Sequence, residues 1–453
     1  MSKHEISLAY YGDDFTGSTD ALDFLCRAGV KTVLFIETPD AEKLSRFKDV
    51  QAIGIAGTSR SLTPEAIEKE LTQVFSALKQ LNPTYIHYKV CSTFDSAPHI
   101  GSIGKAIDVG INIFGKQPVP LLVGAPALGR YCAFGNLFAR MGIGSSGQIY
   151  RLDRHPSMSK HPITPADESD LRLHLSKQTD QKIGLIDITD LENGYETCLQ
   201  KINQLTAENN TVILFDALTE SHLKLIGKLL EAVKQKKQTL FSVGSSAIEM
   251  ALGNHLPQQQ NQQINTTAGK ASPILVLSGS CSPVTSGQIT YALANGFREI
   301  SVDTSKIIQN DNTEDLISSY TIQATEILKS GKSLIIHTSK GPNDERLQRS
   351  AKILKAKQKS SAELLGSVLG LIANKILEKI SLTRLVIAGG DTSGFAAKAM
   401  GVEALEMVVP FVVGAPICKA YTAPDYPANG IEINFKGGQV GAEDYFVKAA
   451  QGM

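Results

Sequence analysis

Short apolar runs alternate along the chain with amphipathic stretches of helical period. The first run, Ile6 to Tyr11, consists of β-formers, and the stretch from Ala21 to Ala28 reads as a helix that ends at Gly29. A longer amphipathic helix extends from Pro64 to about Leu81, with Thr63 as its N-cap. Strands that alternate with helices in this way predict an α/β fold, in which helices flank a mostly parallel sheet.

The same alternation continues along the chain. The further predicted strands are 32–36, 50–56, 85–90, 121–123, 182–187, 211–215, 239–243, 273–277, 333–337, 385–388 and 431–435. One stretch, 256–272, is polar, rich in glutamine and without apolar period, which is typical of a linker. Because 453 residues are long for a single domain, we predict an N-terminal domain 1–255, a linker 256–272 and a C-terminal domain 273–453.

Composition excludes several classes of partner. The chain has 45 basic and 45 acidic residues, so it lacks the positive charge that nucleic acids or anionic membranes attract. No apolar run is long enough to span a membrane, and Met1 to Glu5 leads into a strand rather than a signal peptide. The six cysteines are scattered without a C-x-x-C pair, which argues against a structural zinc site and favours the cytoplasm. The sequence leaves a homodimer open.

Two adjacent carboxylates, Asp13 and Asp14, follow the first strand. Open α/β sheets bind ligands at the carboxyl ends of their strands, so these residues are candidates for a functional site. The alternative is that they only cap the following helix and interact with its N-terminal dipole. One aspartate would be enough for a cap, and two side by side repel each other, so we favour a functional role for at least one of them.

Basic residues follow other strands. Arg60 comes after the third predicted strand, Lys89 ends the fourth, and Arg130 follows the fifth. The carboxyl ends of parallel strands share one edge, so these side chains are expected near the two aspartates. Each of them alone would be read as a solvated loop charge. Together they predict a site for a small, polar, anionic ligand.

The segment 142–168 contains few apolar residues in any regular period and reads as a long loop. Long irregular segments in compact domains are usually functional or disordered. His155 and His161 are its most reactive side chains, but no acid accompanies them at the spacing of a metal site. We therefore expect contact with the substrate rather than metal binding.

Glycine- and hydroxyl-rich loops follow the strands of the second domain. They occupy 278–287, 338–341, 389–394 and 436–441, and they contain the candidate ligand-binding residues Ser280, Ser282, Gly437 and Gly438. Glycines let backbone N–H groups approach a ligand closely, and helix N-termini favour anions. Several such loops in one small domain predict a phosphate-rich ligand, most simply a nucleotide. The P-loop motif is absent, and the one G-x-G-x-x-G, at 142–147, lies in a predicted loop and not between a strand and a helix. The sequence therefore argues against P-loop enzymes and standard protein kinases.

With these motifs the chain resembles the four-carbon acid sugar kinases over essentially its full length. The motifs are Asp13 to Gly17, Ser59 to Ser61, Lys89 to Thr93, Gly129-Arg130, Gly279 to Ser282, Gly389 to Thr392 and Lys436 to Gly438. The resemblance implies an N-terminal sugar-acid domain, a C-terminal ATP domain and an active site in the cleft between them. It implies ATP-dependent phosphorylation of a tetronate or 3-oxo-tetronate, with Mg²⁺.

The resemblance also implies which residues contact each ligand. On the sugar acid it places Asp13 or Asp14, Arg60, Lys89, Val90, Cys91 and Ser92. On ATP it places Ser280, Gly389, Gly390, Asp391, Thr392 and a glycine near Gly438. The catalytic base is expected to be Asp14 or Asp13, with Asp14 preferred, while Arg60 and Lys89 hold the carboxylate of the substrate. Asp391 is either a Mg²⁺ ligand or a helix cap.

The chain departs from the family pattern in the segment after Lys89. Family members commonly carry Lys-x-x-Asp-Ser-Thr-Leu-Arg-Gly-Asn, whereas this chain has Cys91 in place of the acid and Asp95 in place of the arginine. A branched or oxidised acid such as 3-oxo-isoapionate is therefore as good a candidate substrate as a plain tetronate.

Two other functions stay open at this point. Glu37, after the second strand, stands where a nicotinamide-dependent oxidoreductase would bind a ribose, although no G-x-G-x-x-G follows the first strand. A sugar-acid-binding regulator without catalysis would not need the second, phosphate-binding domain.

Overall fold

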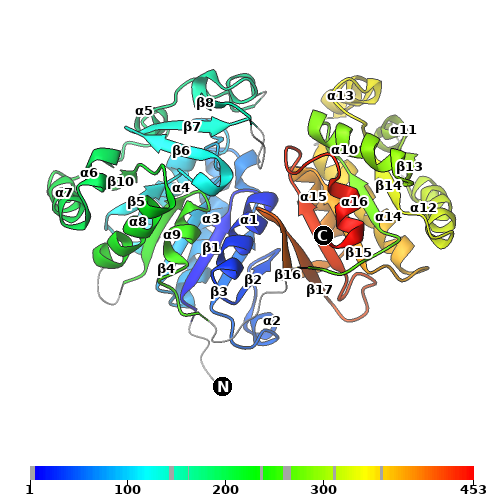
Figure 1. The fold of residues 1–453 in the computed structure, drawn as a ribbon, viewed down its shortest axis with the longest axis horizontal. Helices are drawn as coiled ribbons and strands as arrows, with labels where there is room; N and C mark the ends of the chain where they lie inside the picture. The colour runs from blue at the N-terminus through cyan, green and yellow to red at the C-terminus, as the bar shows by residue number, and fades with distance from the viewer. Residues whose placement is uncertain are drawn as a thin grey trace. The chain divides into compact units, whose positions relative to one another are not determined.

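The computed structural model describes residues 6–141, 147–161, 163–234, 238–258, 267–309, 313–357 and 361–453. The chain divides into two compact units, Met1–Gln262 and Gln263–Met453, and strands alternate with helices in both (Figure 1). The division falls in the segment 256–272. Residues 259–266 of that segment lie outside the described part, so the linker stays a prediction.

The main strands of the N-terminal unit all run parallel. In spatial order they are β2 (Thr32–Phe35), β3 (Ala52–Ala56), β1 (Leu8–Gly12), β4 (Tyr85–Lys89), β11 (Leu240–Gly244), β5 (Val119–Leu122), β10 (Val212–Phe215) and β9 (Ile183–Ile186). Most of their residues are Val, Ile, Leu, Ala, Phe or Tyr, as expected for strands that helices cover on both faces.

The strand order changes direction at β1. The chain runs from β1 to β2, returns to β3 beside β1, and then crosses to β4 on the other side of β1. Because the loops after β1 and β4 leave this point in opposite directions, a crevice opens at the carboxyl ends of these two strands. The motifs at Asp13-Asp14 and at Val90 to Ser96 lie in these two loops.

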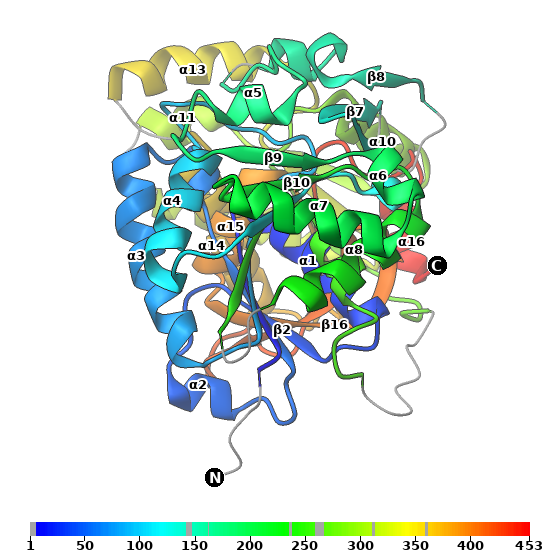
Figure 2. The same cartoon turned by 90° about the vertical axis from the view of Figure 1, so that its left-hand side faces the viewer.

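Helices cover both faces of this sheet. They are α1 (Phe15–Arg27), α2 (Ala41–Ser45), α3 (Pro64–Gln80), α4 (Ile103–Phe114), α5 (Leu171–Leu175), α6 (Ile188–Glu192), α7 (Tyr195–Ala207), α8 (Glu220–Val233) and α9 (Ala247–Leu252). α3 and α4 pack together on one face, and α1, α9, α8 and α7 follow one another on the other face (Figure 2). On the α3 side, Tyr11, Phe75 and Tyr88 form a buried aromatic cluster.

A small antiparallel sheet follows β5. It consists of β6 (Arg130–Ala133), β7 (Asn136–Arg140) and β8 (Ile149–Arg151), with the short helices η3 (Leu152–Arg154) and η4 (Met158–Lys160) after it. The expectation of an irregular segment over 142–168 is therefore wrong for β8, which pairs with β7. Residues 142–146 and 162 lie outside the described part.

The C-terminal unit begins with parallel strands and ends with antiparallel ones. In spatial order its strands are β13 (Arg298–Ser301), β14 (Leu334–His337), β12 (Leu275–Ser278), β15 (Arg384–Ala388), β18 (Glu432–Lys436), β17 (Ala415–Thr422) and β16 (Val402–Val412). A two-residue turn at Val413 and Gly414, the latter with φ of 78°, connects β16 to β17 and makes this pair antiparallel. The sequence analysis predicted neither of these two strands.

The order of the first four strands of this unit repeats that of the N-terminal unit. The chain runs from β12 to β13, returns to β14 beside β12, and crosses to β15 on the other side. The strand order therefore changes direction a second time, at β12, and the glycine-rich loops after β12 and β15 start at this switch point. The helices of this unit are α10 (Pro283–Ala294), α11 (Thr304–Gln309), α12 (Glu314–Lys329), α13 (Glu345–Lys357), α14 (Ser361–Leu377), α15 (Gly390–Ala399) and α16 (Tyr445–Gln451).

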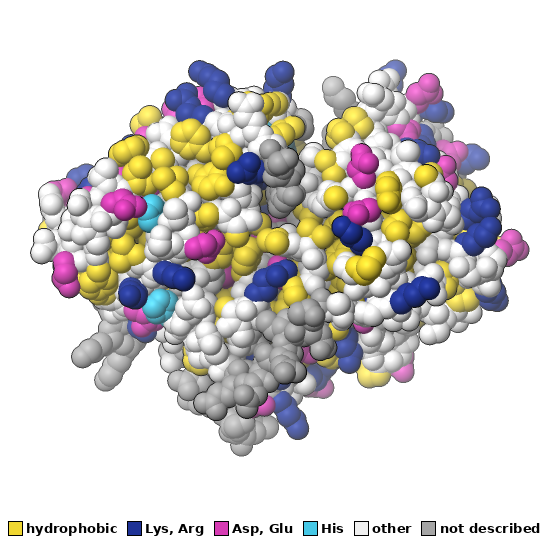
Figure 3. Space-filling model, in the orientation of Figure 1, with side chains coloured by type: hydrophobic (Ala, Val, Ile, Leu, Met, Phe, Trp, Pro, Cys, Tyr) yellow, Lys and Arg dark blue, Asp and Glu magenta, His cyan; other side chains and the backbone are white. Residues whose placement is uncertain are grey.

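The strands predicted from the apolar runs are confirmed, each within two residues of its observed ends. The two-unit α/β architecture is also confirmed. Among the described helices none is long and apolar enough to cross a bilayer. Basic and acidic side chains are interspersed on the face that Figure 3 shows, in line with the balanced composition.

We predict that the buried guanidinium of Arg384 is essential to the C-terminal unit. It is 0% exposed, pairs with Glu432 and donates to the carbonyl oxygens of Ala268, Gly269 and Ala449. Arg384→Met leaves these acceptors without donors and should lower the free energy of unfolding by about 3–5 kcal/mol, measured by urea denaturation. The matched change at the exposed Arg349 should cost less than about 0.5 kcal/mol. Equal effects of the two changes would contradict the prediction.

Candidate functional site

Arg60 joins the two aspartates that follow β1. Its Nη2 lies 2.8 Å from Asp13 Oδ1 and 2.9 Å from Asp14 Oδ1, and its Nη1 donates to Asp14 Oδ2 at 3.0 Å. Arg60 belongs to η1 (Ser59–Ser61), directly after β3, and its backbone N–H donates to the carbonyl of Asp13. Neighbouring parallel strands thus bring the three charges together, as the sequence predicted from their positions at strand ends.

The two carboxylates have different surroundings. Asp14 is the N-cap of α1, where it also accepts from Gly17 N at 2.8 Å and Thr16 Oγ1 at 2.9 Å. Burial favours a raised pKa of Asp14, but Arg60, Lys89 and these donors outweigh it and lower the pKa. Burial raises the pKa of Asp13, against the opposing effect of Arg60, its one side-chain donor among the described residues.

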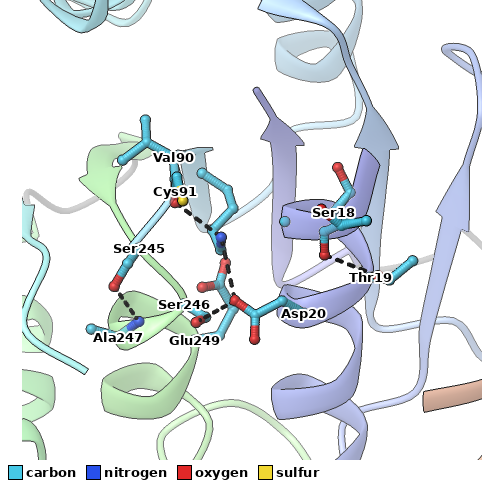
Figure 4. A network of polar contacts seen from close by, with 12 residues as sticks. Ser18, Thr19, Asp20, Val90, Cys91, Ser245, Ser246, Ala247 and Glu249 are labelled. Carbon is cyan, nitrogen blue, oxygen red and sulfur yellow. Dashed lines mark hydrogen bonds and ion pairs between the residues drawn. The ribbon is translucent and has the colours of Figure 1, made fainter. Parts of the chain in front are cut away.

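Lys89, at the end of β4, is 1% exposed and faces α1 and α9. Its Nζ donates to the carbonyl of Val90 at 3.0 Å and lies 3.4 Å from Asp20 Oδ2. Asp20 comes from α1, and it accepts at 2.7 Å from Ser246, which precedes α9; Figure 4 shows them together with Glu249. Burial would lower the pKa of Lys89, but Asp20, Glu249 and Asp13 raise it, so the amine stays charged.

A histidine–glutamate pair completes this network. His87 and Glu249 are both 0% exposed, and His87 Nδ1 lies 2.5 Å from Glu249 Oε1. The other ring nitrogen, Nε2, lies 3.1 Å from the carbonyl oxygen of Gly244. Both ring nitrogens of His87 therefore face oxygen atoms, which fixes the orientation of the ring.

The segment after Lys89 turns sharply into the same crevice. Phe94 is buried with φ of 57°, a left-handed conformation that is rare for a bulky residue and that accumulates at functional sites. Ser96 Oγ lies 2.8 Å from Nε2 of His174, a residue of α5, and this hydrogen bond holds the turn in place. Burial raises the pKa of the Cys91 thiol to about 11, so this residue is protonated at neutral pH. Among the described groups, Asp95 Oδ1 is buried without a hydrogen-bond donor.

Arg130 begins β6 and is 6% exposed. Its Nη1 donates to the carbonyl oxygens of Leu128, Gly129 and Arg140, and no described carboxylate forms an ion pair with it. Its Nε is buried without a described partner. Burial lowers the pKa of Arg130, although Cys91, Asp95 and Asp20 act in the opposite direction. The group remains a cation, and it faces the acids of the crevice from the β5 side.

The residues predicted on the sugar-acid side thus gather around the switch point of the N-terminal unit. These residues are Asp13, Asp14, Arg60, Lys89, Val90, Cys91, Ser92 and Arg130. Sequence reasoning missed Asp20, His87, Ser246 and Glu249. Asp20 and Glu249 are acids at core-facing positions of helices, a pattern that could have flagged them. His155 and His161 instead accept from backbone N–H groups of their own turns, at Ser157 and Thr164.

In the C-terminal unit the loops after β12, β15 and β18 touch one another. Gly279 N donates to the carbonyl of Ala388 at 3.0 Å, and Gly389 N donates to that of Lys436 at 2.9 Å. A Cβ at Gly279 would lie 2.0 Å from Thr392 Oγ1, and Gly389 has φ of 130°, so both positions require glycine. Backbone amides and hydroxyls therefore line this edge, with no space for larger side chains.

Two further elements, Gly438 and the start of α10, lie at the same edge. We call this edge, with the loops after β12, β15 and β18, the cradle. A Cβ at Gly438 would lie 3.0 Å from Ser280 Oγ, and Thr285 Oγ1 donates to the carbonyl of Gly438 at 3.0 Å. Helix α10 begins beside it, capped by Ser282, whose Oγ accepts from Val284 N. A phosphate group fits such a lining of glycines, hydroxyls and a helix N-terminus. Gly390 begins α15, whereas the side chain of Asp391 lies outside the described part. No described group of three or more His, Cys, Asp or Glu could hold a metal ion.

Family models match both units. Residues 8–252 match a model described as "Sugar-binding N-terminal domain", and residues 275–446 match one described as "Nucleotide-binding C-terminal domain". The chain belongs to the four-carbon acid sugar kinase family. Among the relatives of this kinase family, a 3-oxo-isoapionate kinase of Paraburkholderia graminis is 39% identical over 98% of this chain and 94% of its own length. A 3-oxo-tetronate kinase of Pectobacterium atrosepticum is 26% identical, over 98% of both chains.

Solved structures show the same fold in other bacterial proteins. A protein of Salmonella typhimurium, described as a putative tRNA synthase, has a TM-score of 0.78 at 23% identity, over 98% of both chains. Protein HI1011 of Haemophilus influenzae has a TM-score of 0.70 at 23% identity. At this level of identity the similarity shows the kinase family's fold and nothing more.

We predict that Lys89 stabilises the N-terminal unit through Asp20. Lys89→Met leaves the buried carboxylate of Asp20 without its cation and should lower the free energy of unfolding by about 3–5 kcal/mol. Adding Asp20→Asn should recover a measurable part of this loss, because the two residues interact directly. Chemical denaturation of the two single variants and the double variant measures the coupling. Strictly additive losses would contradict the ion pair.

Proposed function

We propose that this chain is an ATP-dependent kinase that phosphorylates a hydroxyl of a small sugar acid. The observation that carries the proposal is the pair of switch points, one lined by acids and buried cations and the other by glycines and hydroxyls. We propose 3-oxo-isoapionate ahead of the 3-oxo-tetronates as substrate, because the relative with that name is the more similar of the two.

We propose that Arg130 binds the carboxylate of the substrate. The guanidinium of Arg60 is already engaged by Asp13 and Asp14, and Lys89 is engaged by Asp20 and Val90. Arg130 has no described acid partner and a buried, unpaired Nε. Asp95 Oδ1 is a buried acceptor without a described donor, so it could accept a hydrogen bond from a hydroxyl of the substrate.

We propose Asp13 as the catalytic base, in place of the preference for Asp14 drawn from the sequence. The four acceptor positions of the Asp14 carboxylate are taken by Gly17, Thr16 and two contacts from Arg60. Asp13 keeps free acceptor positions, and its raised pKa makes it the stronger base. Asp14 then fixes the start of α1 and, with Asp13, orients Arg60.

In the proposed reaction the substrate hydroxyl oxygen attacks the γ-phosphorus of ATP, and its proton passes to Asp13. The bond between the γ-phosphorus and the bridging oxygen breaks, and ADP leaves. Such catalysis consists mainly of positioning and charge neutralisation. We expect Mg²⁺ to arrive on the nucleotide phosphates, since it keeps several waters and takes few protein ligands.

The strand order argues against a nicotinamide-dependent oxidoreductase. In that class the acid that binds the ribose follows the strand beside β1. Here β3 stands beside β1, and Glu37 follows β2, on the far side of β3. A sugar-acid-binding regulator would leave the glycine-lined edge of the C-terminal unit without a role.

The reaction is tested with a coupled ADP-release assay in Mg·ATP over a panel of sugar acids. We expect turnover with 3-oxo-isoapionate and weaker turnover with 3-oxo-tetronates, threonates and erythronates. Binding of ATP without turnover on any member would mean that the N-terminal unit takes a different acid. Absence of ATP binding would contradict the proposed function.

Asp13→Asn should lower kcat by about 10²–10⁴-fold while ATP affinity is unchanged, because the base is lost. Asp14→Asn keeps an N-cap of equal quality, so its effect on kcat should be much smaller. The acid limb of the wild-type kcat profile should lie above that of an ordinary aspartate, because the pKa of Asp13 is raised. The reverse ranking of the two variants would assign the base to Asp14.

Arg130→Met should raise the KM for the sugar acid by about 10- to 100-fold, the value of one charged hydrogen bond. The KM for ATP should not change. Arg154→Met, at a side chain that is 74% exposed, is the matched control. A sugar-acid KM that Arg130→Met leaves unchanged would show that the carboxylate binds elsewhere.

A further inference from the structure

Lys436 is a buried lysine in the C-terminal unit without a described acidic partner. It ends β18 directly before Gly437 and Gly438, and it is 0% exposed. Its Nζ donates to Thr285 Oγ1 at 3.0 Å and to the carbonyl of Gly437 at 3.0 Å. A neutral amine has two N–H donors, and these two acceptors satisfy both. The third N–H of an ammonium would have no described acceptor.

The surroundings of Lys436 also disfavour a positive charge. Thr285 lies in the first turn of α10, so the amine sits beside the positive end of a helix dipole. From α16 the ring of Tyr445 faces it at 5.6 Å, a contact that favours a cation, but only weakly. Burial raises the pKa of this phenol, so Tyr445 supplies no negative charge. Of the two described acids directly before α16, Asp444 pairs with Lys448, and Glu443 lies beside Gly287 of α10. Burial lowers the pKa of Lys436 to about 7.

The amine lies directly behind the cradle proposed for the nucleotide phosphates. Thr285 Oγ1, which accepts from Nζ, donates in turn to the carbonyl of Gly438. Gly438 approaches Ser280 and Ser282, so Nζ is two hydrogen bonds away from the lining of the cradle. A phosphate group within roughly 6 Å raises the pKa of a buried amine by more than one unit at the screening typical of protein sites.

We propose that Lys436 is the buried counter-charge for the nucleotide phosphates, and that it takes up a proton when the nucleotide binds. The inference rests on the proposed function, because it needs a nucleotide at this edge. Above about pH 7 the amine of the free protein is mostly neutral and fully hydrogen-bonded. The bound phosphates supply the negative charge that the described residues lack, and the amine becomes an ammonium.

The test is calorimetric titration of the full chain with Mg·ATP, without sugar acid, in buffers of different ionisation enthalpy. The slope of the observed enthalpy against the buffer enthalpy counts the protons taken up. At about pH 8 the wild type should take up roughly 0.4 to 0.9 proton for each nucleotide bound, for a rise in pKa of one unit or more, and at about pH 6 at most roughly 0.1, because the amine is then charged beforehand. Lys436→Met should abolish the uptake at pH 8 and weaken binding by about tenfold or more.

Lys448→Met, at a half-exposed lysine of α16, is the matched control and should keep the full uptake. If Lys436→Met does not fold, the pH dependence of proton uptake by the wild type still tests the inference. Histidines have a lower pKa than the proposed amine, so uptake by histidines would be larger at pH 6 than at pH 8. Nucleotide binding without uptake at pH 8 would overturn the inference and leave the proposed function intact; a charged Lys436 paired with Asp391 would give this result. Absence of nucleotide binding would overturn both.

Discussion

The contact of Arg60 with Asp13 and Asp14 is the constraint on which the N-terminal site depends. Two neighbouring carboxylates that are almost completely buried repel each other and lose their hydration. A single guanidinium, delivered from the adjacent parallel strand, interacts with both and offsets this cost. The pairing also leaves the two acids unequal, because Asp14 is further engaged by the start of α1 while Asp13 is not.

The buried basic residues described above fall into two groups by the partners they have. Arg60, Lys89 and Arg384 are buried against described carboxylates, so their charge serves the folded protein itself. Arg130 and Lys436 are buried against carbonyls and hydroxyls. Burial of a charge without an opposite charge is costly, and this cost falls when an anion binds. The distinction separates residues that hold the fold from those poised for a ligand.

Much of the fold could be predicted from the sequence because parallel strands buried on both faces give continuous apolar runs. The same logic placed Asp13, Asp14 and Arg60 at one sheet edge. The pair β16–β17 was missed, since these strands are only partly buried and their runs mix apolar and polar residues. The network of Asp20, Ser246 and Glu249 was missed because it depends on how α1 and α9 pack, which no local pattern encodes. The lowered pKa of Lys436 likewise follows from tertiary burial and not from its neighbours in the chain.

Thr392 imposes a restriction on how sequences of this fold can diverge. Its hydroxyl occupies the space that a β-carbon would need at Gly279, and it limits the space at Gly389 as well. Position 279 lies more than a hundred residues from positions 389 and 392 along the chain, yet it cannot drift independently of them. A descendant that acquires alanine at position 279 must first replace Thr392 by a residue without a γ-substituent. Substitutions at this edge should consequently appear in a fixed order during evolution, with position 392 changing before position 279.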